Sequence, residues 1–406
     1  MNITTPEAVG LSSERLAYLE TVMQSYVDQQ QTAGLITLAA RRGKIAHLAC
    51  YGQMDREAGK AMQPDTIFRV ASMTKSITVA ALMMLFEEGR FLFDTPVAQF
   101  IPAFAKLKVV NHSAATGMEH AELEQPMTIR HLLTHTSGLT YDFLEDSPVA
   151  ELYQKSGLFG AFPLAFTKVP MAEVVRGLAE LPLVHQPGQG WRYSVAIDVV
   201  GHLVSLIADM PLDTFLQERI FEPLGMTDTA FVVPPEKHDR IAAAYQFRND
   251  SGLQLIEASA TSPHTHPEHH PNGGLGLLST ATDYWRFAQM LLNRGTVDGA
   301  RILSPKTVDL MTANHISSAL FPLWFGNYFP LRGTGFGLGG SVLMDPAQAG
   351  TLNSPGTFGW GGSLGTSFQV DPQEEMICIT MQQLDLFSPV TINPIFKTLA
   401  YAAIEG

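Results

Sequence analysis

Apolar side chains change their spacing along the chain, and these changes mark the predicted helices and strands. Residues 12–31 carry Leu16, Leu19 and Met23 three or four positions apart, which is the spacing of an amphipathic helix. Residues 34–55, GLITLAARRGKIAHLACYGQMD, hold two apolar runs around an Arg-Arg-Gly turn. That arrangement predicts a β-hairpin.

The same pattern divides the chain into strand-rich ends and a helical middle. Residues 94–245 show mostly helical spacing, whereas the last third holds glycine-rich turns and short apolar runs such as GTFGWGGSLGTSFQVDP and MICITMQQL. A helical pattern returns over residues 390–404. We therefore predict an α+β fold, in which residues 1–93 and 246–406 build one antiparallel sheet covered by helices. Residues 94–245 are expected to form a mostly helical domain beside it.

One predicted helix carries a charged residue at a position where the surrounding apolar pattern predicts burial. Nearly every residue from Ile77 to Phe86 is apolar, so a helix from about Met73 to Glu88 should be buried on most of its surface. Lys75 nevertheless lies in its first turn. A buried lysine is unfavourable unless it is paired or loses its proton.

The residue three positions before this lysine suggests a chemical role for it. Ser72 and Lys75 are spaced to share one helix face. A desolvated lysine that has lost its proton can accept the proton of a serine, which is a weak nucleophile without such a base. The helix N-terminus would also stabilise negative charge near Ser72. The alternative interpretation is that Ser72 is an ordinary helix cap.

Two further segments are candidates for the same site. Tyr193 follows a Pro-Gly turn and precedes a helix; it is either a packed tyrosine or a proton carrier beside the serine and the lysine. The run GWGGSLGT holds Gly361 and Gly362 within a strand pattern. Glycines in a strand indicate a close backbone approach, and here a substrate carbonyl could approach a backbone N–H donor.

Composition and charge exclude several classes of protein. The formal net charge is −13, from 39 acidic and 26 basic residues, and no basic stripe is present that would bind nucleic acid. No apolar run reaches the roughly 18 residues of a membrane span. The N-terminal residues lack the pattern of a signal peptide, so we expect a cytoplasmic protein.

The cysteines and histidines give no sign of a metal or cofactor. Cys50 and Cys378 lie in apolar runs and are expected to be buried free thiols. The histidine-rich stretch HTHPEHHP is interrupted by prolines and has no matching acidic or cysteine partner, so we interpret it as a loop. We therefore expect no metal and no cofactor.

Five motifs in one order carry a family resemblance. They are, in chain order, Ser-Met-Thr-Lys at 72–75, HLLTHTSGL, the Tyr-Ser pair at Tyr193 after a Pro-Gly turn, STATD and GWGG. In this order they resemble the serine β-lactamase and penicillin-binding-protein superfamily, most of all family VIII carboxylesterases and related acyltransferases. The resemblance spans residues 10–400, approximately. It implies a β-lactamase-like fold of the DD-peptidase/class C type, with the active site in the cleft between a sheet domain and an all-helical domain.

The resemblance also implies a role for individual residues. Ser72 matches the family's nucleophile, Lys75 its helix partner and Tyr193 the tyrosine of the second motif. Tyr193 and Lys75 would together remove the Ser72 proton. The backbone N–H groups of Ser72 and Ser363 would form the oxyanion hole.

Two departures from the lactamase pattern bear on the substrate. Trp360, Gly361 and Gly362 stand where lactamases have Lys-Thr-Gly, and Val195 stands where class C enzymes have the asparagine of Tyr-x-Asn. The site therefore lacks the cation and the amide that those enzymes present to a β-lactam. The implied substrate pocket consists of Trp360, Gly361, Gly362, Tyr141 and Val195.

The function implied is that of a metal-free serine hydrolase. Its substrates would be small-molecule esters with a short acyl or an aryl group, which it would cleave through an acyl-enzyme. An acyltransferase using the same Ser-Lys-Tyr residues is the closest alternative. A D-peptidase or weak β-lactamase is a further one. A non-catalytic binding module on this scaffold would normally lose the nucleophile or the lysine, and this chain keeps both.

Overall fold

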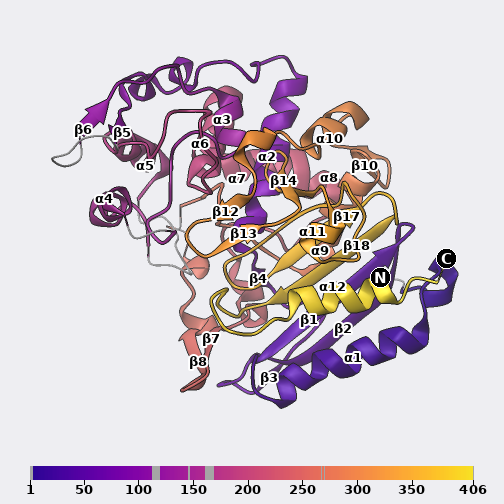
Figure 1. Cartoon of the computed structure of the whole chain (residues 1–406). Helices are drawn as coiled ribbons and strands as arrows, with labels where there is room; N and C mark the ends of the chain where they lie inside the picture. Colours follow the sequence, from indigo (N-terminus) through magenta and orange to yellow (C-terminus); the bar gives the residue numbers. More distant parts are fainter. Residues whose placement is uncertain are drawn as a thin grey trace.

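The computed structural model describes residues 3–111, 119–144, 147–160, 169–266, 268 and 270–405. Its main feature is an eight-stranded antiparallel sheet (Figure 1) with the order β14-β15-β16-β17-β18-β1-β2-β3. Both ends of the chain contribute to it. Its strands are β1 (Gly34–Arg41), β2 (Lys44–Asp55), β3 (Lys60–Ala61), β14 (Thr334–Phe336), β15 (Ser341–Leu343), β16 (Phe358–Gly361), β17 (Ser367–Asp371) and β18 (Met376–Gln382).

Two helices from opposite chain ends cover one face of the sheet. Figure 1 shows α1 (Ser13–Asp28) and α12 (Asn393–Ala402) lying along this face. Leu19 of α1 and Phe396 of α12 belong to one buried apolar cluster, which also contains Cys378 of β18. Because side chains alternate along a strand, the neighbouring Ile377 and Ile379 point to the other face. There they join the main core under α2 (Thr74–Glu87) and α9 (Ala281–Leu292).

The remaining elements are short, and many of them lie between residues 97 and 257. The helices are α3 (Ile129–Leu133), α4 (Pro148–Ser156), α5 (Met171–Leu178), α6 (Ala196–Ala208), α7 (Leu212–Leu216), α8 (Glu222–Leu224), α10 (Pro305–Met311) and α11 (Pro346–Ala349). The two-stranded ladders pair β4 (Phe68–Arg69) with β9 (Leu278–Ser279), β5 (Val109–Asn111) with β6 (Glu119–Ala121), β7 (Ala244–Arg248) with β8 (Gly252–Glu257), β10 (Thr296–Val297) with β11 (Ala300–Arg301), and β12 (Leu323–Phe325) with β13 (Phe329–Leu331).

The predicted pattern of elements agrees with these bounds. The helix expected over residues 12–31 runs from Ser13 to Asp28, and the predicted hairpin is the pair β1–β2, joined at Arg42 and Gly43. The sheet does combine strands from both chain ends. The division of the chain into domains at residues 93/94 and 245/246 stays a prediction.

No single helix among the described residues has the length and apolar character of a membrane span. The bent pair formed by residues 196–208 and 212–224 meets that test only when both segments are taken together, across a bend of 82°. Most residues of α6, the first of the two segments, are buried in the main core.

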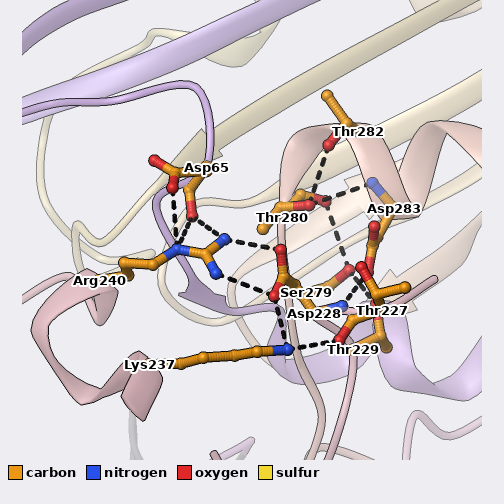
Figure 2. A network of polar contacts seen from close by, with 10 residues as sticks. All are labelled: Asp65, Thr227, Asp228, Thr229, Lys237, Arg240, Ser279, Thr280, Thr282 and Asp283. Carbon is orange, nitrogen blue, oxygen red and sulfur yellow. Dashed lines mark hydrogen bonds and ion pairs between the residues drawn. The ribbon is translucent and has the colours of Figure 1, made fainter. Parts of the chain in front are cut away.

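The STATD motif has a structural function as a helix start. Thr280 caps α9, because its side-chain oxygen accepts a hydrogen bond from the backbone N–H of Asp283 at 3.1 Å. The Asp283 carboxylate in turn accepts from the Asp228 N–H at 2.7 Å. Figure 2 shows how Asp228 continues this network to Arg240 and Lys237, with which it forms ion pairs of 2.6 and 2.9 Å. The network fastens residues 227–240 to the start of α9.

The loop between α3 and Tyr141 is held by a left-handed glycine. Gly138 has φ +85°, and a Cβ atom added there would lie 2.2 Å from the carbonyl oxygen of His185. Its own carbonyl accepts a hydrogen bond from the Val184 N–H at 2.8 Å. The neighbouring His135 carbonyl accepts from the Arg192 N–H, also at 2.8 Å. These contacts fix the loop against the segment that leads to Tyr193.

We predict that Gly138→Ala lowers the free energy of unfolding by about 2–4 kcal/mol, because left-handed strain adds to overpacking against a backbone oxygen. Gly157→Ala is the matched control, since Gly157 has φ +68° but nothing within 4 Å of the added Cβ. It should lose only about 1 kcal/mol. Urea denaturation of both variants measures the difference, and equal losses would contradict the packing argument.

Candidate active site

Ser72 lies in a strained turn directly before α2. It belongs to the 3₁₀ turn Ala71–Met73, and Ala71 adopts a left-handed φ of +46°. Such conformations in a residue other than glycine cost about 1–3 kcal/mol and concentrate at functional sites. Ser72 is 6% exposed and lines a cavity of about 520 Å³. The strained turn thus presents the serine to this cavity.

The buried amine of Lys75 is surrounded by oxygen atoms. The side chain is 0% exposed. Its Nζ donates to Ser72 Oγ at 3.2 Å, to the Tyr141 hydroxyl at 3.1 Å and to the Gly274 carbonyl at 2.8 Å. These contacts use all three N–H positions of an ammonium group. In the neutral amine, two N–H groups can serve Tyr141 and Gly274 while the lone pair faces Ser72 Oγ.

A buried carboxylate completes this chain of polar groups. The Tyr141 hydroxyl donates to Asp198 Oδ2 at 3.2 Å, and Asp198 is 0% exposed. Burial raises the pKa of Asp198 to about 6, while the charge of Lys75 and the hydrogen bond from Tyr141 oppose that rise. Gly274 permits this arrangement, since a Cβ there would lie 2.3 Å from Asp198 Oδ2. The backbone at Gly274 can approach both Lys75 and Asp198 because this residue has no side chain.

Tyr193 lies over the lysine, but its hydroxyl has another partner. The Lys75 Nζ is 4.8 Å from the centroid of the Tyr193 ring. The Tyr193 hydroxyl accepts a hydrogen bond from the indole N–H of Trp360 at 3.1 Å. Within the described residues it makes no hydrogen bond to Ser72 or Lys75. The structure thus brings Tyr193 into the site, whereas the tyrosine hydroxyl that contacts Lys75 is that of Tyr141.

His135 supports the tyrosine from behind. Its ring centroid is 4.8 Å from that of Tyr193, and its Nδ1 is 3.0 Å from the hydroxyl of Ser194. Burial and the nearby charge of Lys75 keep the pKa of His135 well below its usual value. A neutral imidazole therefore packs beside the tyrosine without adding a positive charge.

The predicted oxyanion donors lie on neighbouring segments. Ser363 lines the same cavity as Ser72, and its carbonyl accepts from the Leu386 N–H at 2.8 Å. A Cβ on Gly362 would lie 2.3 Å from Thr366 Oγ1 and 2.6 Å from the Val70 carbonyl. Gly362 thus lets the end of β16 approach the backbone just before the serine, rather than making room for substrate alone. The role of the two amide groups stays a prediction.

The cavity wall is aromatic on the side of the serine, and it differs in part from the predicted one. Trp360, Gly361 and Gly362 line it as expected. Tyr141 and Val195, which were expected there, do not line it. Tyr141 is turned inward to Lys75, and Val195 is 0% exposed because it packs in the core at the start of α6. The other aromatic residues of the wall are Phe143, Tyr193, Phe325, Phe329 and Phe368.

Sequence reasoning missed three parts of the site: Asp198, the glycine segment around Gly274, and the β12–β13 hairpin with its phenylalanines. An aspartate inside the apolar run VAIDVVGHLV was a usable signal for the first, and the double glycine of NGGLG for the second. The hairpin has no comparable signal, because its aromatic residues fit an ordinary strand pattern equally well.

No group of three or more His, Cys, Asp or Glu side chains in the described part of the chain is placed to hold a metal ion. In the histidine-rich stretch, His264 is buried with its Nδ1 3.1 Å from the Phe231 carbonyl. His269 lies outside the described residues.

The pKa of Asp198 predicts a link between activity and stability. An unfolded-state pKa near 3.8 and a folded-state pKa of about 6 correspond to roughly 3 kcal/mol. Between these values the folded protein binds a proton that the unfolded chain has released, so the free energy of unfolding falls as the pH rises from about 4 to about 6. Asp198→Asn should weaken that decrease and raise stability at pH 7 by up to roughly 3 kcal/mol, while lowering activity because Lys75 loses its nearby negative charge.

Asp283→Asn is the matched control for this prediction. Burial also raises the pKa of Asp283 to about 6, but its carboxylate belongs to the network of Figure 2 and does not line the cavity. It should change the pH dependence of stability and leave activity unchanged. Urea denaturation from pH 4 to 8, together with an activity assay, compares the two variants. An Asp198→Asn variant that keeps the wild-type pH dependence and full activity would contradict the assignment.

Comparisons with known proteins find relatives of this chain. The family model described as Beta-lactamase matches residues 19–393. Esterase EstB of Burkholderia gladioli is 34% identical over 90% of this chain and 90% of that protein, and protein Rv1367c of Mycobacterium tuberculosis is 39% identical over 91% and 92%. The solved structure of EstCE1, described as a hydrolase with promiscuous acyltransferase activity, has a TM-score of 0.78 at 28% identity over 97% of this chain and 99% of that one. The predicted family and the β-lactamase-like fold are thereby confirmed: this chain belongs to the beta-lactamase family.

Proposed function

We propose that this protein is a serine carboxylesterase that cleaves small acyl or aryl esters through an acyl-enzyme on Ser72. The observation that carries the proposal is the 3.2 Å contact between Ser72 Oγ and the buried Lys75 amine, at the wall of an aromatic cavity. A neighbouring base is what converts a serine hydroxyl into a nucleophile. The relationship to Esterase EstB supports the choice of esters as substrates.

The reaction follows from these positions. Ser72 Oγ attacks the ester carbonyl carbon while its proton passes to the neutral amine of Lys75. The carbonyl oxygen becomes an oxyanion, which the backbone N–H groups of Ser72 and Ser363 would stabilise. The bond to the alcohol oxygen then breaks, and the proton returns to that oxygen from Lys75, directly or through Tyr193. Water repeats the sequence on the acyl-enzyme and releases the acid.

The polar groups behind Lys75 keep it in place during this exchange. Tyr141 and the Gly274 carbonyl hold Nζ from two directions, so the amine has little freedom to turn away from the serine. Asp198 lies behind Tyr141 and favours the ammonium form that arises when Lys75 takes the proton. The Tyr193 oxygen accepts a hydrogen bond from Trp360, so its O–H can still donate a proton to the substrate's leaving oxygen.

The wall beside the serine favours an ester over a β-lactam. Trp360 stands where lactamases carry a lysine, and its indole N–H is bound to Tyr193. A β-lactam carboxylate would meet an aromatic ring there instead of a cation. Phe143, Phe325 and Phe329 line the same cavity and would bury an apolar acyl or aryl group.

Acyl transfer to a second alcohol is the alternative that one comparison favours, since EstCE1 is described as having promiscuous acyltransferase activity. The same residues would serve both reactions, because an alcohol can replace water in attacking the acyl-enzyme. The ratio of acid to new ester formed when an alcohol is added to the assay separates the two activities.

We predict that Ser72→Ala abolishes hydrolysis of p-nitrophenyl butanoate and that Tyr193→Phe lowers kcat by about 10²-fold, the scale of lost proton-transfer assistance. Spectrophotometric release of p-nitrophenolate measures both. Hydrolysis of nitrocefin by the wild-type protein is the control for substrate class. Wild-type turnover of nitrocefin well above that of the ester would overturn the proposed substrate, and undiminished kcat in Tyr193→Phe would remove that hydroxyl from the mechanism.

A further inference from the structure

The cavity that contains Ser72 extends to α12, where its chemical character changes. Besides the aromatic residues near the serine, its wall includes Gln369 of β17 and Asn393 and Lys397 of α12. Lys397 is half-buried. The end of the cavity far from the serine is therefore polar and carries the side chain of Lys397. Beside the serine, Trp360 occupies the position at which lactamases have a lysine.

The strands and α12 show which way this polar end lies. Gly361 pairs with Ser367, and Gly359 pairs with Gln369 two positions further along, or about 7 Å at the rise of a strand. Helix α12 starts at the serine end, because the Asn393 side chain donates to the Gly365 carbonyl at 3.0 Å. Lys397 is one helical turn further, about 6 Å. Gln369 and Lys397 thus lie together, away from the reacting serine.

Two groups at this end have no protein partner within the described residues. Lys397 makes no hydrogen bond and no ion pair with that part of the chain. Gln369 is 4% exposed, and its Nε2 lies buried beside the Cys378 thiol, with no oxygen or nitrogen acceptor for its N–H groups in the part of the chain that the structure describes. A buried donor without an acceptor is destabilising, and Lys397 and Gln369 are both donors that a ligand oxygen would satisfy.

The neighbours of Lys397 do not neutralise it. Cys378 is opposite Gln369 in the sheet, and burial raises the pKa of its thiol to about 12, so the thiol remains uncharged at neutral pH. The Asp371 carboxylate is occupied by the Tyr401 hydroxyl at 2.9 Å and by the Ser354 N–H at 2.9 Å. Burial lowers the pKa of Lys397, as expected for an amine that has lost water without gaining an anion.

We propose that the α12 end of this cavity is a subsite for an anionic group on the ester substrate, a carboxylate or an oxyanion of similar size, bound by Lys397 and Gln369. The assignment rests on the proposed esterase function and narrows its substrate class to amphipathic esters. An apolar portion lies against the phenylalanines near Ser72, and a carboxylate at the other end pairs with Lys397. The carboxylate accepts one charge-assisted hydrogen bond from Nζ and one from Gln369 Nε2.

Two ester series test this subsite and show which side of the substrate carries the charge. In the acyl series, p-nitrophenyl monoesters of unbranched dicarboxylic acids are compared with p-nitrophenyl alkanoates of equal length. In the alcohol series, 4-carboxyphenyl butanoate is compared with 4-acetylphenyl butanoate. Lys397→Met removes the charge and keeps a similar length. Lys306→Met, at an exposed lysine that does not line the cavity, is the control for net charge.

In at least one series, Lys397→Met should lower kcat/KM for the anionic ester by about 10- to 100-fold, mainly through KM, which is the scale of one hydrogen bond to a charged group. The neutral ester should change by less than about threefold, and Lys306→Met should change neither. Lys397→Arg should retain most of the preference for the anionic ester. An equal loss for charged and neutral esters, or no loss in either series, overturns the subsite.

A binding measurement keeps this test separate from the proposed function. Hexanoate, titrated calorimetrically, should bind the wild-type protein more tightly than hexanamide does, and Lys397→Met should remove that difference. If the wild-type protein hydrolyses no ester but shows this Lys397-dependent preference, the esterase proposal fails and the anion subsite stands. If it hydrolyses neutral esters and shows no preference for hexanoate, the subsite fails and the esterase proposal stands.

Discussion

The position of one buried amine governs the rest of this site. Lys75 has no contact with solvent, and its three polar neighbours come from the turn before its helix, from the loop at Tyr141 and from the backbone at Gly274. A charged group in such surroundings is tolerated only where every donor finds an acceptor. The fold therefore has to bring these segments to within hydrogen-bond distance of a single nitrogen, and many features of the structure serve that requirement.

Glycines provide the close approaches. Gly274 passes against Asp198, Gly362 passes against Val70 and Thr366, and Gly138 passes against His185. At each of these positions a Cβ atom would lie closer than 3 Å to a neighbouring atom. The positions belong to different segments, and together they let the nucleophile turn, Lys75 and the loop of Tyr141 pack closely behind the wall of the cavity. Strain at Ala71 and the raised pKa of Asp198 show that stability is given up at this site in favour of geometry.

Local patterns in the sequence predict part of this arrangement and not the rest. The spacing of Ser72 and Lys75 at the start of one helix is a local property, and so is the pair of glycines after Trp360, so the sequence predicts both. Which tyrosine hydroxyl reaches Lys75 depends on how the loop of Tyr141 docks, and no local pattern contains that information. Asp198 lies within an apolar helix, where its partner is known only once α6 is packed beside α2. The sequence around Lys397 is typical of a surface lysine on an amphipathic helix, and only the structure shows the cavity under α12.

The two ends of the cavity suggest that reaction and recognition of the substrate's charge take place at separate positions. Aromatic side chains, that of Trp360 among them, line the cavity near Ser72 and would bury the apolar part of an ester. The polar residues of β17 and α12 lie further away, where they can recognise a substrate without disturbing the proton transfers. In the proposed substrate the anionic group would bind at α12 and the reacting carbonyl at Ser72, so recognition of the charge would not require a cation beside the serine.

The rate at which a neutral alkyl fluorophosphonate modifies Ser72 tests the role of Lys75 most directly, because this reaction needs an activated hydroxyl and none of the later steps. The wild-type protein and Lys75→Met would be compared by mass spectrometry over time. Loss of the neighbouring base should slow phosphonylation of Ser72 by about 10²- to 10⁴-fold. Equal rates in the two proteins would show that the reactivity of Ser72 does not depend on Lys75, and would contradict the proposed mechanism.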